Sequence, residues 1–211
     1  DQIMAYATDT DGSERFTIRF RNLTTGQELP DIIPGVNGGF VFAKDNKHLL
    51  YTPVNEQWRT EKVMLHALGS DVKADRELYR ETDQTFQVGV GVTNSESHIL
   101  IATGDNETSE VRLLSAHNPL ADPILVRARK KGVEYDVEEH SGTLFIPTNE
   151  DSTQFSLKTA SLKSPAKWKT LIAAKPDFYM TGVSTFADFF VVEGRDRGLD
   201  LHQGSARGVG Q

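Results

Sequence analysis

The sequence of 211 residues contains no cysteine, which excludes a disulfide scaffold, a cysteine-based zinc site and a cysteine nucleophile. It also lacks an apolar run of about eighteen residues, so no transmembrane helix is expected. No basic segment followed by an apolar stretch marks a secretory signal, and this predicts cytoplasmic residence. Basic residues are outnumbered, because 23 Lys and Arg against 30 Asp and Glu leave a formal net charge of −7. This balance disfavours nucleic-acid binding.

Helical periodicity is missing as well. The segment 59–68 comes nearest to it, but Val63, Leu65 and Ala67 alternate with other residues, as they would in a strand. Elsewhere, short apolar runs recur between clusters of Gly, Asn and Asp, which favour turns. Short strands separated by such turns predict an all-β protein.

The predicted strands repeat along the chain. Equivalent positions in successive apolar runs are spaced by 45, 50, 45 and 45 residues, namely Tyr6, Tyr51, Ile101, Ile146 and Val191. Each complete repeat accommodates four antiparallel strands, which is the size and strand count of a β-propeller blade. A β-sandwich is the alternative, but it does not explain a period that recurs along the whole chain.

The predicted fold is therefore a partial β-propeller with about four to five blades. The first apolar run begins at residue 3, so the first repeat lacks its inner strand and the chain is expected to be part of a larger ring. Glycines on the inner strands are expected where a side chain would collide with the next blade, at Gly38, Gly39, Gly89 and Gly91. The predicted blades are 3–35 (partial), 36–81, 86–129, 133–174 and 179–203 (partial), followed by a flexible tail over 204–211.

Five segments carry a family resemblance: AYATDTDGSE (5–14), IRFRNLTTG (18–26), TSEVRLL (108–114), GVEYDVEEH (132–140) and GVSTFAD (182–188). They resemble the N-terminal propeller of oligopeptidase B, in the prolyl oligopeptidase family of serine peptidases, over about residues 2–199. The resemblance implies a seven-bladed propeller that caps a C-terminal α/β-hydrolase domain. It also implies that the hydrolase domain cuts short peptides after Lys or Arg, and that the propeller keeps folded proteins out.

The sequence departs from the family after Leu199. The nucleophile elbow Gly-x-Ser-x-Gly, which places a serine between a strand and a helix, is absent. The segment GSARG (204–208) has the wrong spacing. No catalytic residue, cofactor-binding residue or metal ligand is therefore predicted here. The expected partners are the hydrolase domain, short basic peptides and, through open blade faces, further copies of the chain, with no nucleic acid and no membrane.

Two polar patterns suggest metal binding but have simpler interpretations. Asp9-x-Asp11-Gly12-x-Glu14 resembles the start of a calcium loop, yet its twelfth position is Phe20 where a glutamate is needed, and a hairpin turn is favoured. The six histidines form no i, i+4 pair, and surface or strand-end positions are favoured over metal ligation. They are His48, His66, His98, His117, His140 and His202.

Two charged clusters remain. The basic cluster 127–131 falls between two predicted blades, where a solvated linker is favoured over contact with an acidic partner. In the acidic stretch 134–139, alternation places Glu134, Asp136 and Glu138 on one side of an inner strand and Tyr135 with Val137 on the other; Glu139 completes the stretch. Carboxylates along a propeller tunnel would attract basic peptides, although ordinary solvation of a strand edge is the favoured interpretation.

Two functions are compatible with these observations. The chain is either the propeller portion of an oligopeptidase B-like serine peptidase, gating substrates and silent by itself, or a free-standing propeller that acts as a binding or scaffold module.

Overall fold

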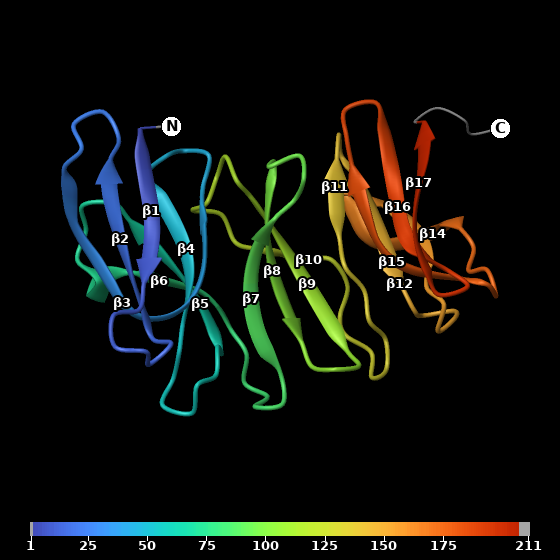
Figure 1. The fold of residues 1–211 in the computed structure, drawn as a ribbon, viewed down its shortest axis with the longest axis horizontal. Helices are drawn as coiled ribbons and strands as arrows, with labels where there is room; N and C mark the ends of the chain where they lie inside the picture. The colour runs from blue at the N-terminus through green and yellow to red at the C-terminus, as the bar shows by residue number, and fades with distance from the viewer. Residues whose placement is uncertain (1, 207–211) are drawn as a thin grey trace.

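The computed structural model describes residues 2–206 and consists almost entirely of β-strands (Figure 1). The described residues include no α-helix, and their one 3-10 turn is η1 (Val72–Ala74). This confirms the predicted all-β class. None of the described segments forms a helix with the length and apolarity needed to cross a membrane. The strands are β1 (Ile3–Thr8), β2 (Phe16–Asn22), β3 (Glu28–Phe42), β4 (His48–Pro53), β5 (Lys62–Ala67), β6 (Arg76–Arg80), β7 (Gln87–Val92), β8 (His98–Gly104), β9 (Ser109–Ser115), β10 (Ile124–Leu125), β11 (Glu138–His140), β12 (Thr143–Thr148), β13 (Ser156–Ser161), β14 (Ser164–Ile172), β15 (Phe178–Thr185), β16 (Phe189–Asp196) and β17 (Leu199–Ala206).

Neighbouring strands pair antiparallel in chain order, as hairpin connections require. The third and fourth blades are four-stranded sheets, β7 to β10 and β11 to β14, and β15 to β17 form a three-stranded sheet. The first two blades share one six-stranded sheet because β3 is the outer strand of the first blade and continues as the inner strand of the second. Gly35 and Gly38, with φ of 71° and 87°, bend β3 between these two roles, and such backbone angles favour glycine.

The core is divided into four apolar clusters, each between two successive blades. Burial of apolar side chains from both facing sheets stabilises this stacking. Across the blades, β3 also contacts β7, and β11 contacts β15. Face-to-face stacking of successive small sheets confirms the propeller architecture over a sandwich. Deeply buried members include Ile18, Phe20, Ile33 and Leu49 between the first and second blades, Leu50, Val63, Ile99 and Ile101 between the second and third, Leu113, Leu144 and Ile146 between the third and fourth, and Leu157 with Met180 between the fourth and fifth.

The blades form an open arc. In Figure 1 the sheets follow one another from blue to red along the longest axis, and the first and last sheets lie at opposite ends. This agrees with the prediction of a partial propeller.

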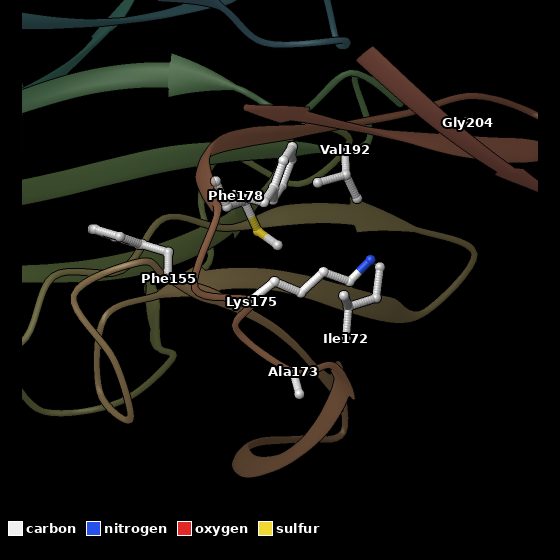
Figure 2. Close-up of a pocket in the computed structure, with 8 residues that line it drawn as sticks. Phe155, Ile172, Ala173, Lys175, Phe178, Val192 and Gly204 are labelled. Atoms are coloured by element: carbon white, nitrogen blue, oxygen red, sulfur yellow. The ribbon is translucent and has the colours of Figure 1, made fainter. Parts of the chain in front are cut away.

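The junction between the fourth and fifth blades contains a cavity. The cavity has a volume of about 250 Å³ and is walled by Phe155, Ile172, Phe178 and Val192 (Figure 2). At the preceding junction, Trp168 packs edge-on against Tyr135 with ring centroids 5.0 Å apart. The cavity walls carry one charged side chain, Lys175, and no acid–base pair.

Two predictions about glycine and the tail require correction. A methyl group on Gly89 would meet no atom within 4 Å, and one on Gly91 would only touch Leu100 at 4.0 Å, so neighbouring blades do not force glycine at these positions. Glycine is instead needed for its backbone at Gly38, where φ is positive. Strand β17 continues to Ala206 because its backbone pairs with β16, so 204–206 are not a tail; residues 207–211 lie outside the described residues.

Candidate functional site on the inner strand of the fourth blade

The acidic stretch lies along the inner strand of the fourth blade. Tyr135, Val137 and Glu139 are buried, whereas Glu134, Asp136 and Glu138 retain contact with solvent. This confirms the predicted alternation. The regular strand β11 begins only at Glu138, later than the sequence predicts, although Tyr135 still bridges to Thr148. Backbone hydrogen bonds to the neighbouring strand nevertheless continue before Glu138, from the Asp136 N–H to the Pro147 carbonyl at 3.2 Å and from the Asn149 N–H to the Glu134 carbonyl at 3.3 Å.

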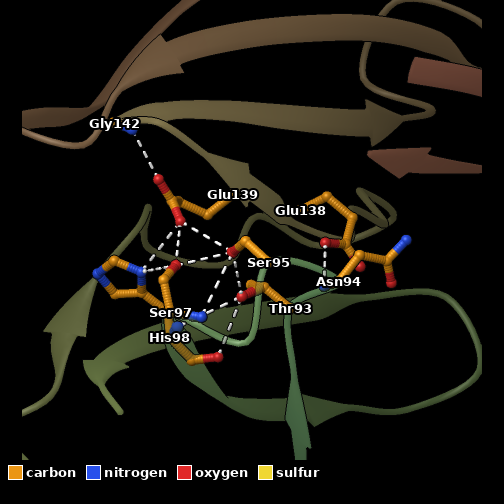
Figure 3. Close-up of polar contacts among 8 residues, drawn as sticks. All are labelled: Thr93, Asn94, Ser95, Ser97, His98, Glu138, Glu139 and Gly142. Carbon is orange, nitrogen blue, oxygen red and sulfur yellow. Dashed lines mark hydrogen bonds and ion pairs between the residues drawn. The ribbon is translucent and has the colours of Figure 1, made fainter. Parts of the chain in front are cut away.

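Glu138 occupies an unusual environment. Its Oε2 accepts one hydrogen bond, from the Asn94 backbone N–H at 2.8 Å, which comes from the loop after β7 in the third blade (Figure 3). Burial raises the pKa of Glu138 to about 7, and the nearby charges of Asp136 and Glu139 act in the same direction against the Asn94 hydrogen bond. Burial also raises the pKa of Asp136, a residue that still has contact with solvent. The inner strand therefore presents one carboxyl, that of Glu138, that can change charge near neutral pH.

Glu139 points the opposite way and ties the third blade to the fourth. Its Oε1 accepts the Gly142 N–H at 2.7 Å, and its Oε2 contacts Ser95, Ser97 and the His98 ring (Figure 3). Burial alone would raise the pKa of Glu139, but these donors outweigh it and the pKa is lowered. Glu139 is 3% exposed, so the cluster is a structural contact between blades.

This cluster contains a serine, a histidine and a glutamate but is not arranged for nucleophilic catalysis. Ser97 Oγ lies 2.8 Å from His98 Nδ1, and Glu139 Oε2 lies 3.2 Å from the same nitrogen. A catalytic relay places the serine on one ring nitrogen and the carboxylate on the other. The backbone of 204–206 belongs to β17 and does not form a strand-to-helix elbow.

The basic cluster is more than a solvated linker. Arg129 donates to both carboxylate oxygens of Glu81, at 2.7 and 3.0 Å, and its guanidinium lies 4.1 Å from the centre of the Phe86 ring. Burial alone would raise the pKa of Glu81, but Arg129 and the Asp83 N–H lower it to about 2. We call this pair the Glu81–Arg129 latch; it ties the segment after the second blade to the segment after the third.

Arg127 makes a second contact of this kind. Its guanidinium pairs with Glu150 and stacks on the Trp168 ring, 3.9 Å from the ring centre. Lys130 and Lys131 are exposed, so the solvated-linker interpretation holds for the lysines and is wrong for the two arginines. The physical reason is that guanidinium groups form paired hydrogen bonds with carboxylates and stack on rings.

The Asp9 segment is a hairpin turn, as predicted. Asp9 Oδ1 accepts the backbone N–H groups of Asp11 and Gly12, and Oδ2 accepts that of Glu14 at 2.7 Å. The turn joins β1 to β2, which pair through Thr8 and Thr17. These backbone donors lower the pKa of Asp9. All of its carboxylate contacts are thus used to shape the turn.

The histidines lie apart from one another. Within residues 2–206, no group of three or more histidine and acidic side chains is placed to hold a metal ion. His117 and His202 are exposed, His140 is part-buried on β11, and His48 bonds to Asp45. His66 contradicts the predicted surface placement, because it is fully buried between two aspartates, although it lies next to the last residue of β5. Its partners are distant in sequence, so no local pattern reveals them.

Comparison with known proteins places the chain in a family. Residues 1–203 match the model described as the prolyl oligopeptidase N-terminal β-propeller domain. Protease 2 of Moraxella lacunata is 31% identical over 198 residues, which are 93% of this chain and 29% of that protein. Dipeptidyl aminopeptidase BI of Pseudoxanthomonas mexicana is 32% identical over 95% of this chain and 28% of its own length.

Solved structures of similar proteins agree with this family match. Oligopeptidase B from Leishmania major superimposes with a TM-score of 0.92 at 30% identity, covering 99% of this chain and 30% of that one. Oligopeptidase B from Trypanosoma brucei, in a closed form with covalently bound antipain, gives a TM-score of 0.90 at 30% identity, covering 98% of this chain and 29% of that one. The chain spans less than a third of each relative. It belongs to the N-terminal β-propeller domain family of the prolyl oligopeptidases.

Proposed function

We propose that this chain is the access-controlling portion of an oligopeptidase B-like serine peptidase that cleaves short peptides after Lys or Arg. The observation that carries the proposal is the alignment of nearly the whole chain with under a third of proteins named as peptidases. The catalytic serine, histidine and aspartate would reside on a C-terminal α/β-hydrolase domain of the parent protein. The propeller would shield that site and admit short, flexible substrates by size.

The inner strand of the fourth blade supports a preference for basic peptides. Glu134, Asp136 and Glu138 retain solvent contact on one side of the strand, on an acidic chain. Carboxylates on a concave surface raise the local concentration of cations, and so of peptides that contain Lys or Arg.

The first experiment concerns the chain alone. Incubated with arginyl and lysyl chromogenic peptides, the purified chain is expected to release no chromophore. Hydrolysis that persists through repurification and follows this chain would contradict its proposed lack of catalytic activity.

The second experiment concerns the protein encoded by the complete reading frame. It is expected to cleave a short arginyl peptide while sparing the same site inside a folded protein domain, and to cleave that site once the domain is unfolded. Equal cleavage of the folded and unfolded forms would contradict access control. A reading frame without a hydrolase domain would favour the free-standing binding module.

A further inference from the structure

His66 is a fully buried titratable side chain outside the acidic strand, and its contacts join the first two blades. It lies on β5 with no exposed surface. Its Nδ1 lies 2.8 Å from Oδ1 of Asp75, and its Nε2 lies 3.0 Å from Oδ1 of Asp31. Asp31 belongs to the part of β3 that is the outer strand of the first blade, whereas His66 and Asp75 belong to the second.

The partners of the two carboxylates indicate where the protons lie. Asp75 Oδ2 accepts the Tyr51 hydroxyl at 2.8 Å, and Asp31 Oδ1 also accepts the Gly69 N–H. Asp31 Oδ2 has no hydrogen-bond partner, so a proton there would have no acceptor. Ionised carboxylates only accept hydrogen bonds, and both ring nitrogens of His66 can donate to them only when each carries a proton.

From this geometry we infer that His66 is a buried imidazolium that clamps the first blade to the second, and that loss of its proton loosens this junction. A neutral ring would leave two buried carboxylates without a compensating cation, which is strongly unfavourable. The alternative is a neutral His66 beside a protonated Asp31. It is disfavoured because Oδ1 of Asp31 already accepts the Gly69 N–H, and a proton on Oδ2 would have no acceptor.

The groups that face His66 are few. Asp31 approaches from β3, Asp75 from the segment after η1, and Tyr51 from β4 through Asp75. The Phe20 ring from β2 covers one face of the imidazole, with ring centroids 6.0 Å apart and planes inclined by 28°. Burial and the hydrogen bond to Asp75 raise the pKa of Tyr51, so its hydroxyl remains a donor to Asp75.

A pH dependence follows from proton linkage. Wherever the folded chain keeps a proton on His66 that the unfolded chain has released, folding takes up a proton and stability falls as the pH rises. The clamp therefore stabilises the junction at neutral pH and weakens it on the alkaline side.

The direct test reads the ring nitrogens of the unmodified chain by NMR after labelling its histidines with ¹⁵N. The exposed His117 is the internal reference. At a mildly alkaline pH where His117 is neutral, His66 is expected to keep the shifts of two protonated nitrogens. A His66 that shows one protonated and one bare nitrogen under these conditions would overturn the inference, and this test requires no variant to fold.

The second test compares His66→Gln with the matched control His117→Gln. The free energy of unfolding is measured in urea from neutral to alkaline pH. The control is expected to keep the alkaline decline of the unmodified chain, whereas His66→Gln should show a shallower decline because the amide does not titrate and only the share from Glu138 ionisation remains. An unchanged alkaline decline in His66→Gln would exclude His66 as its source and contradict the clamp.

Discussion

Two glutamates at junctions between blades show opposite behaviour. Glu81, in the Glu81–Arg129 latch, has a pKa of about 2, whereas Glu138, on the inner strand of the fourth blade, has a pKa of about 7. Burial disfavours the charged form of both. Glu81 meets a guanidinium on both oxygens, whereas Glu138 meets only backbone N–H groups, among them that of Asn94, and two like charges. The identity of the partner, more than burial, decides whether a carboxyl between blades is a fixed anion or changes charge near neutrality.

The difference in pKa matches the locations of the two glutamates. The latch holds segments that connect successive blades, where a permanent ion pair adds rigidity. Glu138 lies on an inner strand and retains solvent contact, where a change of charge alters the surface that a peptide would meet. We therefore expect the latch to control stability at acid pH and Glu138 to control the inner surface near neutral pH.

Breaking the latch should give the largest effect. Arg129→Met leaves the buried Glu81 carboxylate without its cation, and we expect a loss of about 3–5 kcal/mol of unfolding free energy at neutral pH. The matched control is Arg195→Met, whose partner Asp200 is 80% exposed, and it should cost less than about 1 kcal/mol. Urea unfolding measures both. Equal losses in the two variants would mean that the latch is an ordinary surface pair.

Acid titration of the latch should give the next largest effect. The pKa of Glu81 is lowered in the folded state from 4.5 to about 2, so its stabilisation is fully present above 4.5 and is lost as the pH falls toward 2. The shift corresponds to about 3 kcal/mol. Glu81→Gln does not titrate, and its unfolding free energy should therefore fall less steeply over this interval. Parallel acid profiles for the two proteins would argue against the lowered pKa.

The blades were predictable from the sequence, but these partners were not. The spacing of Tyr6, Tyr51 and Ile101 reflects a local pattern that each blade repeats, and alternation correctly placed Glu138 on the accessible side. The latch joins residues 48 positions apart, and Asp31 lies 35 positions from His66. Contacts between blades depend on how sheets stack, which no short-range pattern encodes.

The same limit explains why crowding was wrongly predicted at Gly89 and Gly91. A glycine on an inner strand can reflect crowding, a positive φ or neither, and the sequence does not distinguish these. Gly38 has a positive φ, whereas Gly89 has neither feature. Gly194, which the sequence did not single out, is the crowded position, because a methyl group there would lie 2.6 Å from the Tyr179 carbonyl oxygen.

Neutralising Glu138 should give a smaller effect of opposite sign. Its folded-state pKa is raised from 4.5 to about 7, so its contribution favours folding below 4.5 and disappears as the pH rises through 7. Relative to the parent chain, Glu138→Gln should leave the free energy of unfolding unchanged in acid. At mildly alkaline pH it should raise that free energy by about 1–2 kcal/mol, after allowance for solvent screening. The measurement is urea unfolding at both pH values. A loss at alkaline pH would show that the ionised form is the stabilising one.

The smallest effect should come from Asp136→Asn, which separates burial from charge at Glu138. The amide oxygen can still accept the Val137 N–H, so the backbone is preserved while one like charge is removed. The pKa of Glu138, followed by NMR titration of its carboxyl carbon, should fall by less than about one unit. It should stay above 4.5, because burial is the larger cause. A return to the ordinary value would make the Asp136 charge the main cause, and the contrast between Glu81 and Glu138 would then depend on neighbouring charges alone.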